Sequence, residues 1–119
     1  MSRRKNRLEA VHCLYQYDLL ELGSKENKNI NNALCEGVIE NIIEIDKIIE
    51  DSLESYSLYR LSYIDRAIIR LATYEMKYTD TAHQIIINEA IEITKELSDI
   101  DDKQFKFNNR VLDNIKKKV

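Results

Sequence analysis

The two histidines of the chain each follow an acid by three positions: Glu9 precedes His12, and Asp80 precedes His83. Pairs of Glu-x-x-His motifs on facing helices, with two further glutamates, hold the metals of di-iron helical bundles. Asp80 and His83, however, fall in a segment predicted to be a loop, and Glu9 beside Arg7 is expected to be solvated. The sequence therefore predicts no metal site.

Other residue types suited to catalysis show no informative spacing. The two glycines, Gly23 and Gly37, are isolated, so the chain has no glycine-rich loop that could hold a phosphate. The 21 acidic residues include no pair whose spacing indicates acid–base catalysis. Cys13 and Cys35 could form at most one disulfide and lie in no C-x-x-C motif, so buried reduced thiols are the favoured interpretation. These observations argue against nucleotide hydrolysis and redox catalysis.

Basic residues gather at both ends of a chain that is acidic overall. Residues 1–7 carry a charge of +4 and residues 103–119 a charge of +5, whereas the whole chain carries −3. Positive charge before the N-terminal end of a helix opposes the helix dipole, unless an anion binds there. RNA phosphates would supply that anion, although basic ends can also serve solubility alone. The charge pattern predicts a polyanion-binding face.

Composition and periodicity predict one all-helical domain over residues 1–119. The chain has no proline and only two glycines, fewer than the tight turns of an all-β protein usually need, so helices are favoured. No apolar run approaches the length that spans a bilayer, so we expect a cytoplasmic protein without membrane contact. Apolar stripes at helical spacing predict helices over residues 8–22, 34–53, 62–78, 84–97 and from about 101 onward, with residues 1–7 as a short basic arm.

The third predicted helix carries charge on two of its faces. Ser62 and Asp65 have the spacing of a capping box, which predicts its first turn. Glu75 falls on the apolar stripe, whereas Arg66 and Arg70 lie four residues apart on a more polar flank.

Three stretches of the chain, in this order, carry a family resemblance. The first is RRKNRLEAVHCLYQYDL, the second is IDRAIIRLATYEMKY, and the third is INEAIEITKEL followed by KFNNRVLDNI. Together they resemble the NusB family of bacterial transcription antitermination factors, whose third stretch reads INEAIELAK and KFVNGVLD. The resemblance covers nearly the whole chain. It implies an all-α fold, a helical bundle of two packed three-helix subbundles, with no enzymatic activity and no cofactor.

The resemblance also implies a function and partners. Family members bind the boxA RNA of ribosomal RNA transcripts together with NusE, a ribosomal small-subunit protein. They act on RNA polymerase alongside NusA and NusG, and they occur as monomers or homodimers. Two alternatives remain open: a helical protein-interaction module without RNA binding, and a stand-alone relative of the NusB-like domain of rRNA cytosine methyltransferases. The second would need a catalytic domain, which we do not expect beyond Val119.

Matched position by position, the resemblance implies RNA contacts at both ends of the chain. Phe107 matches an aromatic near the RNA, where a base could stack on its ring, and Asp65 matches an acid facing NusE. Lys103 replaces an acid of the family pattern, Asn108 a valine and Arg110 a glycine. The predicted RNA-binding residues are Arg3, Arg4, Lys5, Arg7, Lys103, Lys106, Phe107 and Arg110.

Overall fold

The computed structural model describes residues 3–20, 32–53, 57–97 and 102–119, with side chains described from residue 105 in the last range. Within these ranges every regular element is a helix, and no described helix is long and apolar enough to cross a membrane. The predicted all-α fold is confirmed. The elements are α1 (Arg3–Leu19), α2 (Ala33–Glu40), α3 (Ile42–Ser52), the 3-10 helix η1 (Leu58–Arg60), α4 (Tyr63–Tyr78), α5 (His83–Leu97) and α6 (Asp102–Lys116).

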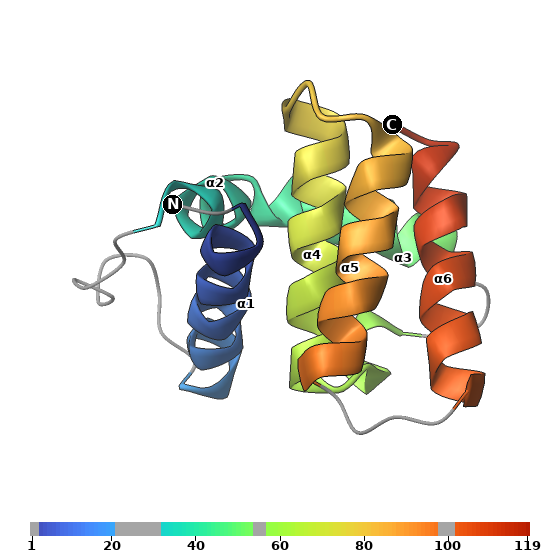
Figure 1. Ribbon diagram of the computed structural model, residues 1–119, viewed down its shortest axis with the longest axis horizontal. Helices are drawn as coiled ribbons and strands as arrows, with labels where there is room; N and C mark the ends of the chain where they lie inside the picture. The colour runs from blue at the N-terminus through green and yellow to red at the C-terminus, as the bar shows by residue number, and fades with distance from the viewer. Residues whose placement is uncertain (1–2, 21–31, 54–56, 98–101) are drawn as a thin grey trace.

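Helix α4 is the centre of the bundle, because it packs against each of the other α-helices. Figure 1 shows α4, α5 and α6 side by side, with α1 on the other side of α4 and with α2 and α3 running across behind it. The last three helices also contact one another in every pairing. They form one three-helix subbundle, and α1 to α3 pack onto it mainly through α4.

Helix α1 begins earlier than its apolar stripe predicts. The buried stripe of α1 that contains Val11 and Leu14 continues one turn further toward the N-terminus. There Arg7 is also buried, at 6% exposed. Residues 3–7 are therefore helical, and the prediction of a basic arm over residues 1–7 is wrong for them. Periodicity missed this turn because an arginine occupies the position where an apolar residue is expected.

The long helix predicted over residues 34–53 is divided into α2 and α3 at Asn41. The Nδ2 of Asn41 donates to the carbonyl of Gly37 at 2.8 Å, and the backbone N–H of Asn41 also bonds to Gly37 at 3.2 Å. Asparagine competes in this way with the regular helical hydrogen bonds. The break turns the chain between the α1 side of the bundle and the α6 side.

Two contacts join α1 to α2, and a glycine of α2 permits close packing against α4. Cys13 and Cys35 form a disulfide with a Cα–Cα distance of 6.4 Å, which corrects the prediction of reduced thiols. Asn32, the N-cap of α2, accepts from the Cys35 N–H at 3.0 Å and donates to Asn6 Oδ1 at 2.9 Å. Gly37 permits α4 to approach, since a side chain there would meet the ring of Tyr74. These contacts fix α2 across α1 and α4.

Arg70 on α4 is buried rather than outward, contrary to its predicted place on a polar flank. Its Nε and Nη2 donate to the two carboxylate oxygens of Asp46 on α3, each at 2.8 Å, and its Nη1 donates to Asp18 on α1 at 2.9 Å. Burial lowers the pKa of Arg70, but the hydrogen bonds and charges of Asp46 and Asp18 outweigh burial and raise it. The Arg70 side chain thus links α1, α3 and α4 through hydrogen bonds.

Arg66, one turn earlier on α4, is also buried, so the flank that the sequence marks as more polar lies inside the bundle at both arginines. It shares Asp18 with Arg70, at 3.3 Å, and donates to the backbone carbonyls of Tyr59 and Leu61. Its guanidinium carbon lies 4.7 Å from the ring centroid of Tyr59 and 5.1 Å from that of Tyr63. Hydrogen bonds and aromatic rings thus replace most of the water that an exposed arginine would hold, while the buried Nε of Arg66 has no hydrogen-bond partner.

Candidate nucleic-acid interface

The basic residues at the start of α1 differ in their exposure and in their partners. Arg3 and Lys5 are exposed. Arg4 and Arg7, three residues apart, face the carboxylates of α4 and α5. The helical register therefore separates four residues that the sequence pattern had grouped as one RNA-binding run.

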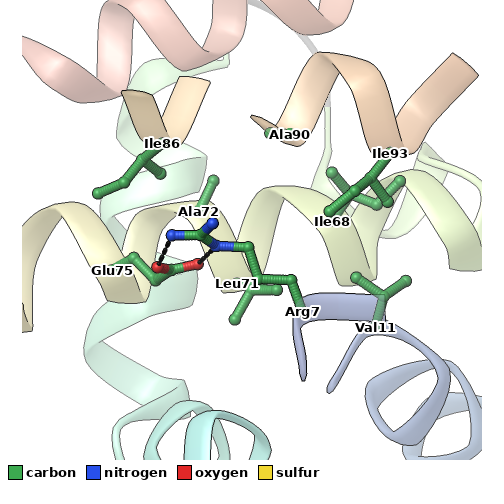
Figure 2. A pocket seen from close by; sticks show the side chains of 9 residues that line it. All are labelled: Arg7, Val11, Ile68, Leu71, Ala72, Glu75, Ile86, Ala90 and Ile93. Carbon is green, nitrogen blue, oxygen red and sulfur yellow. Dashed lines mark hydrogen bonds and ion pairs between the residues drawn. The ribbon is translucent and has the colours of Figure 1, made fainter. Parts of the chain in front are cut away.

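Arg7 is part of the core rather than of an accessible surface. Its Nε and Nη2 donate to the two carboxylate oxygens of Glu75 at 2.7 and 2.8 Å, and the two side chains are 7% and 5% exposed. Figure 2 shows Arg7 reaching across from α1 to Glu75 on α4, beneath the apolar side chains of α5. The hydrogen bond to Glu75 raises the pKa of Arg7, against the effect of burial. The ion pair engages Arg7 inside the bundle, and its predicted contact with RNA stays a prediction.

The Arg7–Glu75 pair lies beside a small pocket with room for about one water molecule. Apart from the ion pair, its walls are apolar, so it offers no polar groups that would orient a ligand. The pocket is lined by Arg7, Val11, Ile68, Leu71, Ala72, Glu75, Ile86, Ala90 and Ile93.

Arg4 remains partly exposed but is held by α5. Its Nε and Nη2 donate to Glu89 at 2.9 and 2.8 Å, and its Nη1 lies 3.8 Å from a carboxylate oxygen of Glu96. The hydrogen bond to Glu89 raises the pKa of Arg4, and the same bond lowers the pKa of Glu89. Any phosphate that binds Arg4 must compete with these carboxylates.

The second basic cluster lies on α6. Lys106 and Arg110, one turn apart, are both exposed, whereas Phe107 is half-buried and packs against the core. Lys103 lies in the first turn of α6, and its side chain is outside the described residues. Arg110 stands where the family pattern has glycine. Its larger side chain is accommodated there because it faces outward.

The two basic ends are not adjacent. In Figure 1, α1 and α6 lie on opposite sides of the α4–α5 pair, and α5 presents Glu89 and Glu96 toward α1. A single polyanion that touches both ends would therefore have to pass across or around α5. Within the described ranges, the basic residues of α1 and those of α6 therefore form two separate clusters rather than one continuous basic face.

Asp65 is buried in the first turn of α4, where its N–H donates to Ser62 Oγ at 3.1 Å, as the capping pattern predicts. The carboxylate of Asp65 is turned inward: it accepts from Asn108 Nδ2 on α6 at 3.0 Å, and the residue is 3% exposed. In this chain the carboxylate of Asp65 is therefore held inside the bundle, and the predicted contact of Asp65 with NusE stays a prediction.

No described group of three or more histidine, cysteine, aspartate or glutamate side chains is arranged to hold a metal ion. His12 is exposed and faces Gln16 at 3.3 Å, and His83 lies 3.0 Å from the carbonyl of Met76. The exposed charges, Arg3, Lys106 and Arg110 among them, suit electrostatic contact with a polyanion rather than catalysis.

Comparison with known proteins identifies the family of the chain and agrees with its helical fold. A model of the NusB family matches residues 4–117. The chain belongs to the NusB family. Proteins of the NusB family are non-catalytic transcription antitermination factors, so this chain is a NusB-type antitermination factor and not an enzyme.

Individual NusB proteins resemble the chain over nearly its full length. The transcription antitermination protein NusB of a Nitratiruptor species is 39% identical over 132 residues, covering 99% of this chain and 94% of that protein. NusB from T. maritima has a TM-score of 0.82 at 33% identity, covering 98% of this chain and 92% of that one. A chain in the crystal structure of antitermination factors NusB and NusE with dsRNA has a TM-score of 0.78 at 29% identity, with 100% coverage of both.

The contact between Asp65 and Asn108, where the NusB pattern has valine, gives a testable expectation. Asn108→Val removes the donor to a buried carboxylate and should lower the free energy of unfolding by about 1–3 kcal/mol. Urea denaturation followed by circular dichroism measures this loss. The control is Asn109→Val, the same change at the exposed neighbouring position of α6. Equal losses in the two variants would show that the contact with Asp65 contributes nothing.

Proposed function

We propose that this antitermination factor binds boxA-type RNA of ribosomal RNA transcripts together with NusE. It would act in the cytoplasm, within an RNA polymerase complex that also contains NusA and NusG, and as a monomer or homodimer. The observation that carries the proposal is the exposed pair Arg3 and Lys5 on the first turn of α1, in a chain that matches a NusB–NusE–dsRNA structure along its entire length.

The exposed residues of α6 support the same function. Lys106 and Arg110 add two positive charges on one face of that helix, since side chains four residues apart are neighbours. Lys103 is proposed as a third cation from its spacing in the sequence, and Phe107, which is half-buried against the core, is proposed to contact a base. Basic side chains position the phosphate backbone, so this surface is proposed to hold single-stranded RNA mainly by charge.

The RNA-binding role of α1 is tested by charge removal at its exposed positions. The variants Arg3→Ala and Lys5→Ala should each weaken binding of a boxA-like single-stranded RNA and leave the fold unchanged. Each lost phosphate contact should make the slope of log K against log salt shallower by about 0.7. Fluorescence anisotropy titrations at several salt concentrations measure both the affinity and the slope.

Lys47→Ala on α3 is the matched control, because it removes one exposed positive charge from a helix outside the proposed surface. The titrations are repeated with NusE to find whether NusE raises RNA affinity. If the α1 variants and the Lys47 variant bind with equal affinity and slope, the role of α1 is refuted. If the parent chain binds NusE but no RNA in either condition, the chain is a protein-interaction module without RNA binding.

A further inference from the structure

Helix α5 carries a row of acids on the face turned toward the start of α1. Glu89, Glu92 and Glu96 are spaced three and four residues apart, so they line one side of the helix. Glu89 and Glu96 reach Arg4, and the charge of Glu92 also acts on Arg4. Two carboxylates thus contact one arginine of the basic segment, and a third, Glu92, adds negative charge nearby.

The geometry of Arg4 resembles the way an arginine holds a phosphate. Two nitrogens of its guanidinium donate to the two oxygens of Glu89, and the third faces Glu96 at 3.8 Å. Such two-point binding is the geometry that arginine uses for both carboxylate and phosphate. The acidic row therefore occupies the donors that an RNA phosphate would need.

The exposure of these side chains makes the exchange feasible. The side chains of Arg4 and Glu89 are 40% and 24% exposed, whereas those of Arg7 and Glu75 are 7% and 5% exposed. An exposed ion pair is weak and open to competition, whereas a buried pair is costly to break. Of the two arginines that face the carboxylates, Arg4 can be released while Arg7 remains part of the core.

We propose that the acidic row of α5 competes with RNA phosphate for Arg4 and thereby limits the affinity of the α1 end for RNA. This inference rests on the proposed RNA-binding function and adds an intramolecular regulator to the same surface. RNA binding at Arg4 exchanges the Glu89 carboxylate for a phosphate. The acidic row also repels phosphates that approach Arg4 from the side of Glu96.

The test removes one charge of the row without breaking the two-point contact to Glu89. Glu96→Gln should raise the affinity for a single-stranded boxA-like RNA by about fivefold at low salt, the effect of one unit charge at about 4 Å in water. The gain should shrink as salt increases, because exposed charges are screened. Titrations by fluorescence anisotropy measure it, and circular dichroism verifies that the fold is unchanged.

Two controls separate the role of Arg4 from general repulsion. Glu40→Gln makes the same change at an exposed glutamate on α2 and should give a smaller gain. In an Arg4→Ala background, Glu96→Gln should also lose most of its effect, because coupled residues are not additive. A gain equal to that of Glu40→Gln, or one that is the same with and without Arg4, would overturn the inference while RNA binding stands. A parent chain that binds no RNA would overturn both.

Discussion

Replacing Arg70 by methionine is expected to lower the free energy of unfolding by about 3–5 kcal/mol, because removing one member of a buried ion pair leaves the other charge uncompensated. Arg70 is 2% exposed and holds Asp46 and Asp18, which come from α3 and α1. Methionine retains much of the length of the side chain and none of its hydrogen bonds. Since whole domains are stable by only about 5–15 kcal/mol, this loss is a large share of the total.

Urea denaturation followed by helical circular dichroism measures the loss at Arg70. Arg110→Met on α6 is the matched control, since that arginine is exposed, and surface changes usually alter stability by no more than about 0.5 kcal/mol. Adding Asp46→Leu to Arg70→Met should recover part of the stability, because it removes one of the stranded charges. A loss at Arg70 no larger than that of the Arg110 variant would contradict the structural role of the ion pair.

The helices of this chain were largely predictable because their apolar stripes are regular. The third predicted helix, residues 62–78, agrees with α4 within one residue, since Ser62 caps it as the pattern indicates. The break at Asn41 was not predicted, because the apolar spacing continues across it while the side chain of Asn41 bonds to Gly37. Periodicity reports which face is buried, and it does not report a local competitor for backbone hydrogen bonds.

The charged interior was the part that sequence patterns failed to locate. The position of Glu75 on an apolar stripe was a signal that a buried cation must pair with it. The position of Arg7, four residues before the buried Val11, was a signal that Arg7 lies on the buried face of its helix. The partners are 68 residues apart in the chain, so only the packing of α1 against α4 brings them together. Asp65 was likewise expected to face a partner, whereas Asn108 of α6 binds it inside the bundle.

The buried arginine of α1 gives the second large expected effect. Arg7→Met should lower the free energy of unfolding by about 3–5 kcal/mol, because it leaves Glu75 charged and unpaired in the core. Arg3→Met, in the same segment but exposed, should change stability by no more than about 0.5 kcal/mol. Urea denaturation of the two variants compares a structural arginine with a surface arginine on one helix.

This difference decides how RNA binding by the basic segment must be measured. An Arg7 variant that is partly unfolded would bind less RNA in a simple assay and would imitate the loss of an RNA contact. When affinity is corrected for the folded fraction, Arg7→Met should retain the salt slope of the parent, while Arg3→Met should make the slope shallower by about 0.7. The opposite result would be an Arg7→Met variant that is as stable as Arg3→Met and whose salt slope becomes shallower by the same amount. Arg7 would then be an RNA contact, and its ion pair with Glu75 would contribute nothing to the free energy of unfolding.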